Sequence, residues 1–328
     1  MAQSAGPAKI LVTGGAGYIG SITVWHLLKR GYEVVVVDDL SRGHGNVVPA
    51  NLLNTVRLQD TVALSRLLEG AEAVVHFAAY IAVGESTAKP ELYFANNVGG
   101  SLSLFEAMAR AGVKKIVFSS TAAVYGEPRQ TPIPEDSLFA PVSPYGQSKA
   151  MVEKVLEELD RYRGVRSVVL RYFNACGAEP EANLGEQHAP ETHLIPLLFR
   201  AAVTGEPIQL FGDDYPTADG TCVRDYIHVG DLASAHLAAL DHLIGGGKSV
   251  QFNVGTGTGQ TVLEVLRAVE EISGRKVPYK ISPRRDGDSP SLVADSRKLR
   301  ETLGWTPVRS DLKQIVRDAW DFFVHNSV

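Results

Sequence analysis

The chain has 328 residues, of which 45% are hydrophobic, and its 32 basic and 37 acidic side chains give a formal net charge of −5. This length predicts about two domains, and the apolar content is sufficient for ordinary hydrophobic cores. Nucleic-acid binding normally needs a basic surface, so the charge balance disfavours a nucleic-acid partner.

A membrane or secreted protein is also disfavoured. The longest uniformly aliphatic run, at 34–37, is far shorter than the roughly 20 residues that span a bilayer. Residues 1–9 show no apolar segment of the kind found in signal peptides. The two cysteines, Cys176 and Cys222, do not suggest a disulfide framework and fit a reducing compartment. We therefore expect a cytoplasmic protein without a membrane partner.

In chain order, the first half alternates short β-branched runs with longer helical patterns. Strands are expected at 9–13, 33–38, 73–77, 115–120 and 167–170. Helices are expected at 18–29, 90–110 and 145–163. This alternation predicts an α/β fold, with a Rossmann-like doubly wound parallel sheet buried on both faces, over residues 1–175.

The composition of the sequence changes beyond residue 175, where Pro and Gly become frequent and the predicted strands become shorter and more isolated. Residues 176–328 therefore predict a smaller, mixed α/β domain that binds the substrate. A late strand within 223–256, such as 250–254, could return to the sheet of the first domain.

A glycine-rich loop follows the first strand and precedes the first helix. Gly15, Gly17 and Gly20 satisfy the pattern G-x-G-x-x-G, and Gly14 adds a second reading of the same loop. The glycines permit a tight turn, allow the backbone to approach a pyrophosphate and let helix and strand pack closely. The phosphates would then lie at a helix N-terminus, where free N–H groups favour an anion.

The second strand ends in Asp38, 18 residues after Gly20. A carboxylate at this place accepts hydrogen bonds from the ribose hydroxyls and repels a 2′-phosphate, which predicts NAD rather than NADP. Arg42, nearby in sequence, favours the alternative. Asp60 is either a contact to the adenine edge or a solvated carboxylate.

Tyr145 and Lys149 are four residues apart and therefore project from one face of the helix 145–163. This helix follows the fifth βα unit, where its side chains can reach the nicotinamide end of a dinucleotide. A phenol of pKa about 10 needs roughly 4 kcal/mol of preference for phenolate to act as a base near pH 7. One ammonium about 4 Å away, at an effective dielectric near 20, supplies about that much. Lys149 is thus expected to activate Tyr145 as a general base.

The strand end FSSTAAVYG (118–126) resembles the extended short-chain dehydrogenase/reductase family, which uses Ser or Thr at the position of Thr121 to hydrogen-bond the reacting hydroxyl. Ser120 is the alternative if the strand register shifts. The sugar-nucleotide dehydratases of this family carry Asp-Glu at the two positions after Thr121. Here these are Ala122 and Ala123, which cannot transfer protons, so oxidation and its reversal at C4 are expected without elimination.

Within that family the chain resembles the UDP-glucose 4-epimerases over nearly its whole length. The motifs that carry the resemblance are LVTGGAGYIGS (11–21), VGESTAKPELYFANNV (83–98), SPYGQSK (143–149), LRYFNACGA (170–178), VRDYIHVGDL (223–232), NVGTG (253–257) and RRDGD (284–288). The resemblance implies reversible C4 epimerisation of UDP-hexoses with tightly bound NAD, and a homodimer packed through the helices at 90–110 and 145–163.

The resemblance also implies the site residues. The catalytic residues are Tyr145, Lys149 and Thr121. The NAD contacts are Gly14, Gly17, Tyr18, Ile19, Gly20, Asp38, Asp60, Phe77, Asn96, Ser119, Tyr145, Lys149 and Tyr172. The UDP-sugar contacts are Thr121, Tyr145, Phe173, Asn174, His193, Leu194, Phe211, Arg224, Arg285, Asp288 and Leu292. Two guanidiniums suit a diphosphate because each offers a planar fork of donors.

The chain departs from the family pattern at three positions. Ile81 is apolar where some relatives use a basic residue to reach the cofactor, and His193 replaces an Asn. Leu292 replaces a bulky Tyr, which suggests room for an N-acetyl group and hence activity on UDP-GlcNAc and UDP-GalNAc.

Other activities and a metal are the remaining alternatives. A UDP-uronate 4-epimerase or a net reductase would use the same machinery, and a non-catalytic NAD-sensing scaffold would keep only the fold. The loop at 186–193 contains two Glu and two His, but their spacing matches no recognised motif and the chemistry needs no metal, so we expect no metal site.

Overall fold

The computed structural model of the chain describes residues 7–285 and 287–326. Two parts of the sequence analysis lie outside the described residues. They are residues 1–6 of the N-terminal segment, which lacks a signal-peptide pattern, and Asp286 of the RRDGD motif. The chain divides into two compact units. Unit 1 comprises Met1–Val124, Ser143–Arg171 and Ala233–Phe252; unit 2 comprises Tyr125–Val142, Tyr172–Leu232 and Asn253–Val328.

A twisted sheet forms the centre of unit 1, and its inner strands are uniformly apolar because both faces are covered. Its strands within the described residues, in order across the sheet, are β12 (Val250–Val254), β6 (Arg166–Tyr172), β5 (Lys115–Thr121), β4 (Ala73–His76), β1 (Lys9–Thr13), β2 (Glu33–Asp38) and β3 (Leu53–Thr55). The pairs β1/β2, β1/β4, β2/β3 and β4/β5 are parallel, as the βαβ alternation predicts.

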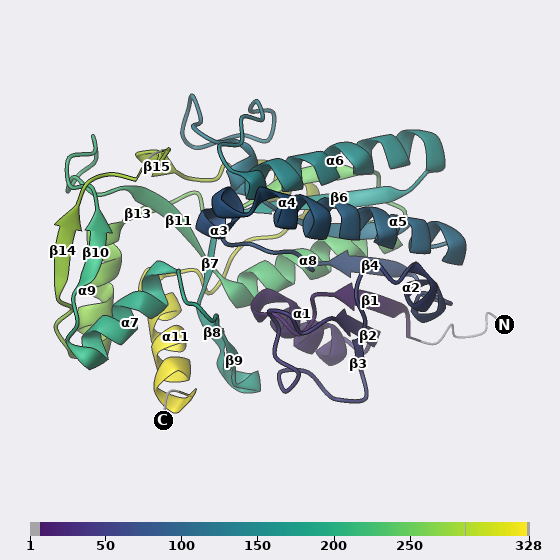
Figure 1. The fold of residues 1–328 in the computed structure, drawn as a ribbon, viewed down its shortest axis with the longest axis horizontal. Helices are drawn as coiled ribbons and strands as arrows, with labels where there is room; N and C mark the ends of the chain where they lie inside the picture. The colour runs from purple at the N-terminus through teal and green to yellow at the C-terminus, as the bar shows by residue number, and fades with distance from the viewer. Residues whose placement is uncertain (1–6, 286, 327–328) are drawn as a thin grey trace. The chain divides into compact units, whose positions relative to one another are not determined.

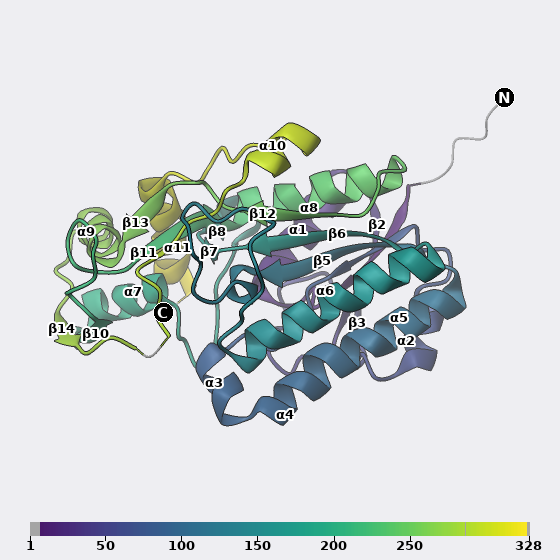
Figure 2. The ribbon, with the colours of Figure 1, turned by 90° about the horizontal axis from the view of Figure 1, so that it is seen from above.

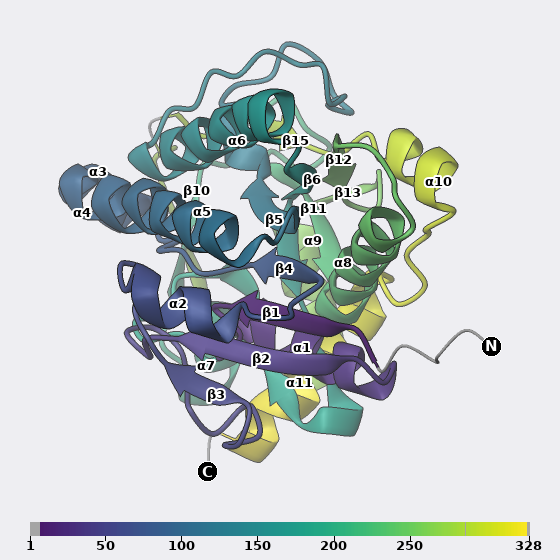
Figure 3. The same cartoon turned by 90° about the vertical axis from the view of Figure 1, so that its right-hand side faces the viewer.

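Helices cover both faces of this sheet. They are α1 (Tyr18–Lys29), α2 (Thr61–Leu67), α3 (Val83–Ala88), α4 (Pro90–Tyr93), α5 (Gly100–Ala111), α6 (Pro144–Arg163) and α8 (Val229–Ile244). Figures 2 and 3 show α2, α5 and α6 along one face and α1 and α8 along the other. Fully buried Leu11, Val74 and Ile116 belong to the core that these layers enclose.

The order of the strands places the ends of β1 and β4 at the centre of the sheet. Thr13 and His76, the last residues of these strands, are register partners. The connections leave β1 and β4 in opposite directions along the sheet, which makes this the topological switch point, where open α/β sheets bind ligands.

Helix α6 has clear local signals at both ends. The hydroxyl of Ser143 accepts a hydrogen bond from the N–H of Gly146, Pro144 occupies the first helical position, and Gly164 ends the helix in a left-handed conformation with φ 66°. These signals fix where the helix that contains Tyr145 begins and where it ends.

Unit 2 is a mixed α/β arrangement of shorter elements (Figure 1). Its strands are β7 (Asn174–Cys176), β8 (Ala178–Glu179), β9 (Leu184–Gly185), β10 (Ile208–Phe211), β11 (Val223–His228), β13 (Gly259–Thr261), β14 (Tyr279–Ser282) and β15 (Ser291–Leu292). Its helices are α7 (Leu194–Thr204), α9 (Val262–Ser273), α10 (Arg297–Leu303) and α11 (Leu312–Asn326). Helices α7, α9 and α11 pack around a core that includes Leu198, Val265 and Ile315.

The predicted fold class, a Rossmann-like sheet with a smaller mixed unit, is confirmed. None of the helices in the described ranges combines the length and the apolar character that crossing a bilayer would require.

Candidate functional site

The glycine loop lies between β1 and α1. At Gly14, φ is +68°, and a side chain there would run into the backbone of Ala78. A side chain on Gly20 would collide with the carbonyl oxygen of Gly14. Gly17 caps α1 and offers no side chain for the helix N-terminus, so a phosphate can take the place of a cap at the amides of Tyr18 and Ile19.

Asp38, at the end of β2, holds this loop from the adjacent strand. Its carboxylate accepts hydrogen bonds from the N–H of Ala16 at 3.0 Å and from the N–H of Leu40 at 2.9 Å. Leu40 has φ 58°, an unusual conformation for a β-carbon-bearing residue, and the bond to Asp38 helps to maintain it. Burial raises the pKa of Asp38, and the two backbone hydrogen bonds oppose that rise.

Arg42, whose position in the sequence left NADP as an alternative, is already paired with an acidic side chain. Its guanidinium makes two hydrogen bonds to the carboxylate of Glu85 and lies over the ring of Tyr80. This arrangement leaves Asp38 as the acidic group at the end of β2, and it fits an adenosine ribose rather than a 2′-phosphate.

The other predicted NAD contacts occupy varied surroundings. Asp60 is exposed and caps α2 by accepting from the N–H of Ala63, so it has a structural use that the sequence did not predict. The ring of Phe77, directly after β4, packs on that of His236 with centroids 4.6 Å apart. Asn96 lies in a π-helical turn, Phe94–Gly99, between α4 and α5.

These features of unit 1 fit NAD. The loop leaves room for a backbone approach, the helix N-terminus favours a diphosphate, and the carboxylate lies at the end of the neighbouring strand. The roles of Asn96, Ser119 and Tyr172 toward NAD stay predictions.

Tyr145 and Thr121 are brought together in unit 1. Thr121 is the last residue of β5 and Tyr145 lies in the first turn of α6; an interaction with Thr121 lowers the pKa of the Tyr145 phenol. Both are nearly buried, at 9% and 7% exposed. The register of β5 thus places Thr121, as the sequence predicts, beside the phenol, whereas Ser120 points elsewhere and bonds Glu153.

Lys149 lies one turn further along α6 and is also buried. Its Nζ atom donates a hydrogen bond to the carbonyl oxygen of Ser119 at 2.8 Å and lies 4.9 Å from the ring centroid of Phe118. Burial lowers the pKa of Lys149 to about 7, against a partial opposing effect of Glu153.

The activation of Tyr145 by Lys149 stays a prediction. Burial raises the pKa of Tyr145 to about 12, and its interaction with Thr121 partly opposes this rise. Loss of hydration around a buried phenolate acts against the attraction of a nearby ammonium.

The sequence did not predict a buried ion pair between Glu153 on α6 and Arg171 on β6. The guanidinium of Arg171 bonds both carboxylate oxygens of Glu153, with Nη2 2.7 Å from Oε2, and the side chains are 4% and 1% exposed. Ser120 donates to the same carboxylate. The available signal was Glu153 itself, four residues after Lys149 and hence on the same face of α6.

In unit 2 the predicted UDP contacts form two pairs. Arg224 donates through Nη2 to Asp288 at 2.9 Å and through Nη1 to the carbonyl oxygens of Val223 and Ser289. The guanidinium of Arg285 lies 3.8 Å from the ring centroid of Phe211. The hydrogen bonds orient the guanidinium of Arg224, and the guanidinium of Arg285 lies over an aromatic ring.

The remaining predicted substrate contacts lie on several elements of unit 2. Leu292 is the register partner of Arg224 across the β11/β15 pair. Phe173 donates its N–H to the carbonyl oxygen of Val254, Asn174 begins β7, and Leu194 begins α7. The roles of these residues toward the substrate stay predictions.

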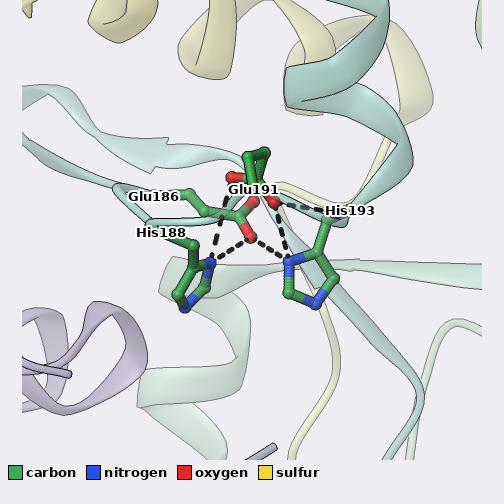
Figure 4. Close-up of side chains that lie close together, drawn as sticks. All are labelled: Glu186, His188, Glu191 and His193. Atoms are coloured by element: carbon green, nitrogen blue, oxygen red, sulfur yellow. Dashed lines mark hydrogen bonds and ion pairs between the residues drawn. The ribbon is translucent and has the colours of Figure 1, made fainter. Parts of the chain in front are cut away.

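His193 has an unexpected environment, shown in Figure 4. It directly precedes α7, and its side chain meets a group of His and Glu side chains from the same loop. We call this group the His/Glu cluster; its members are Glu186, His188, Glu191 and His193.

One carboxylate, Glu186, is at the centre of the cluster. Its Oε1 atom lies 2.9 Å from Nδ1 of His188 and 2.6 Å from Nδ1 of His193. Burial alone would raise the pKa of Glu186, but the two imidazoles lower it to about 2. Burial opposes protonation of His193, yet the carboxylates of Glu186 and Glu191 raise its pKa to about 10.

Comparison with known proteins identifies the family. The model of the NAD dependent epimerase/dehydratase family matches residues 10–255. The chain is 49% identical to a UDP-glucose 4-epimerase of Rhizobium leguminosarum bv. trifolii over 95% of this chain and 96% of that protein.

Solved structures agree with the sequence comparison. A UDP-glucose 4-epimerase from Brucella ovis in complex with NAD superposes with a TM-score of 0.94 at 43% identity, covering 96% of this chain and 98% of that one. A UDP-Glc/GlcNAc 4-epimerase from Campylobacter jejuni superposes with a TM-score of 0.85 at 40% identity, covering 97% and 99%. The chain belongs to the NAD dependent epimerase/dehydratase family.

Proposed function

We propose that the chain catalyses the reversible C4 epimerisation of UDP-hexoses, interconverting UDP-galactose and UDP-glucose, with NAD held in unit 1. The observation that carries the proposal is the placement of Thr121 at the end of β5 and of Tyr145 and Lys149 one turn apart on α6, with all three side chains buried. Two alanines follow Thr121, so the acid and base that an elimination would need are missing from these positions.

The chain's own groups carry the proton at the sugar. Bound NAD would supply a nicotinamide that accepts a hydride from C4 and returns it. Tyr145 takes the proton from the O4 hydroxyl and gives it back, while Thr121 positions the phenol and that hydroxyl. Because burial raises the pKa of Tyr145, loss of its proton needs positive charge nearby, which the nicotinamide of bound NAD would supply together with Lys149 in its ammonium form.

The UDP moiety is assigned to unit 2. Arg224 and Arg285 offer two oriented guanidiniums to the diphosphate, and Asp288 offers an acceptor for a ribose hydroxyl. Phe211, under the guanidinium of Arg285, provides a flat apolar face for uracil. Leu292, next to Arg224 in register, leaves room for an N-acetyl group, so we include UDP-GalNAc and UDP-GlcNAc among the substrates.

A homodimer is part of the proposal. Leu92 on α4, Leu102 on α5 and Met151 on α6 are 36%, 47% and 42% exposed, an apolar surface on the helices that the family resemblance assigns to the dimer. A cytoplasmic location is also proposed, in keeping with the free, buried cysteines.

The test is to incubate the pure protein with UDP-galactose and no added NAD. UDP-glucose that accumulates to equilibrium without net NADH supports the epimerase. Stoichiometric release of NADH would show a net oxidation and overturn the proposal, and a UDP-uronate that turns over in place of both UDP-hexoses would move the assignment to a uronate epimerase.

A further inference from the structure

The His/Glu cluster presents four metal-ligating atoms to one point. One ligand atom from each of its side chains lies within 4.8 Å of the other three. A tetrahedral ion with bonds of about 2.0–2.2 Å to nitrogen and oxygen separates its ligand atoms by about 3.4 Å. The ligand atoms lie within 4.8 Å of one another, and Oε1 of Glu186 is 2.6 Å from Nδ1 of His193, so small shifts of the side chains bring their ligand atoms to that spacing.

The local chain explains how the four side chains converge. The segments 186–188 and 191–193 each carry a Glu and a His at positions i and i+2, and a bend at 189–190 joins the two segments. In an extended segment, residues two apart project to the same side. Each segment therefore delivers one carboxylate and one imidazole, as Figure 4 shows.

Ordinary hydrogen bonds do not account for the contact at His193. Its Nδ1 atom lies 2.6 Å from Oε1 of Glu186 and 3.2 Å from Oε1 of Glu191. Nevertheless this atom is buried without a partner of acceptable hydrogen-bond geometry. The imidazole therefore lies close to two carboxylates without a well-aligned hydrogen bond to either, an arrangement that a cation bound by the imidazole and the carboxylates would explain.

Backbone hydrogen bonds hold the carboxylate of Glu191 in place. Its Oε1 atom accepts from the N–H of Thr192 at 2.6 Å and from the N–H of His193 at 2.7 Å. Its Oε2 atom faces Nδ1 of His188 at 4.0 Å. A carboxylate that is held by backbone donors through one oxygen can offer the other to an ion at little cost in side-chain entropy.

We propose that the His/Glu cluster is a structural binding site for a divalent transition-metal ion, with Zn²⁺ as the ion that fits best. Two imidazoles exclude Ca²⁺ and Mg²⁺ as preferred ions, because these take oxygen ligands. Two carboxylates balance the charge of a divalent ion. Four protein ligands complete a tetrahedral shell, which is typical of a structural rather than a catalytic zinc site.

The ion would take no part in the proton and hydride transfers of the proposed reaction, and its effect would be on the loop that leads into α7. The ion would tie the segment after β9 to the N-terminus of this helix. It would also occupy Nδ1 of His193, so that a contact from this imidazole to a nucleotide would have to come from Nε2.

The test measures Zn²⁺ binding to the full chain after removal of metals with a chelator. Equilibrium dialysis against Zn²⁺, with metal determined by mass spectrometry, is expected to give one ion per chain. His188→Ala, which removes one ligand from a partly exposed position, is expected to weaken binding at least about 10-fold, and Glu186→Gln likewise. His325→Ala, an exposed histidine on α11, is the matched control and should bind as the unchanged chain does.

Two further readouts separate this site from nonspecific binding. Co²⁺ in place of Zn²⁺ should give the intense visible absorption of a four-coordinate ion, and this absorption should disappear in His188→Ala. Millimolar Mg²⁺ or Ca²⁺ should not displace Zn²⁺. No bound Zn²⁺, or equal affinity in His188→Ala and the unchanged chain, would overturn the proposal, as would a preference for Ca²⁺. Circular dichroism and NAD content establish that each variant is folded.

Discussion

The Nζ atom of Lys149 donates a hydrogen bond to the carbonyl oxygen of Ser119, 2.8 Å away, and both residues are buried. A carbonyl oxygen accepts from an amine as well as from an ammonium, so this contact does not by itself keep Lys149 charged. Burial lowers its pKa from 10.5 to about 7, and this has a measurable consequence for stability.

Because the folded-state pKa of Lys149 lies below that of the unfolded chain, the folded protein holds fewer protons between about pH 7 and pH 10.5. Stability therefore rises with pH in this window. From pH 7 to pH 9 the free energy of unfolding should rise by on the order of 2 kcal/mol more in the unchanged protein than in Lys149→Met. Urea unfolding at matched NAD content measures this difference. Lys154→Met, an exposed lysine on the same helix, should follow the unchanged protein; parallel pH curves for Lys149→Met and the unchanged protein would refute the assignment.

The Glu153/Arg171 pair is predicted to be a structural requirement of the site. Glu153→Leu leaves a buried guanidinium without its carboxylate and should lower the free energy of unfolding by roughly 3–5 kcal/mol. The double variant Glu153→Leu/Arg171→Met should recover much of this loss, because no charge remains buried. Denaturant unfolding tests both, with the exposed Glu157→Leu as control; a loss below about 1 kcal/mol in Glu153→Leu would contradict the account.

Asp38 is predicted to set the choice of cofactor. Asp38→Ala removes the acceptor for the N–H groups of Ala16 and Leu40 and for a ribose hydroxyl, and it removes the charge that repels a 2′-phosphate. Loss of a charged hydrogen bond corresponds to roughly 10- to 100-fold weaker NAD binding, and the ratio of NADP to NAD affinity should rise. Cofactor content after gel filtration and competition binding measure both effects. Glu33→Ala at the start of the same strand is the control. An unchanged NADP-to-NAD ratio would show that Asp38 does not read the ribose.

Leu292 is predicted to control the range of sugars. Leu292→Tyr should fill the space assigned to an N-acetyl group and lower kcat/KM for UDP-GalNAc relative to UDP-galactose by at least about 10-fold. The ratio of the two substrates within one protein serves as its own control. Equal losses on both substrates would show that the residue acts on the fold or on UDP rather than on the sugar.

The predicted elements match the structure where the hydrophobic periodicity agrees with the Gly, Pro and capping residues that end an element. The strands at 9–13 and 33–38 coincide with β1 and β2, and β5 extends the predicted 115–120 by Thr121 alone. The helix at 90–110 is continuous in direction but contains the π-helical turn Phe94–Gly99, which hydrophobic periodicity does not reveal. The glycine loop and the i, i+4 pair were readable because each depends on residues close in sequence.

The rest required coordinates because it depends on distant partners or on hydration. Arg171 could not be assigned to Glu153 from sequence, since either charge could have faced solvent. Asp60 was considered for adenine, but a capping role depends on where α2 begins. The burial of Tyr145, which raises the pKa of its phenol, depends on the packing of the whole unit and could not be read from the sequence. The residues at 186–193 were not expected to bind metal, since only the bend at 189–190 shows that the two segments face each other.

The most direct test of the central claim is to follow UDP-galactose deuterated at C4, with no added NAD, in the unchanged protein and in Tyr145→Phe. We predict that the unchanged protein forms UDP-glucose that keeps the deuterium at C4. Tyr145→Phe should stay folded, retain NAD and lose at least about 100-fold in turnover, the lower end for a general base. The exposed Tyr162→Phe on the same helix should turn over normally. Near-normal turnover in Tyr145→Phe, or loss of the deuterium to solvent, would contradict the account.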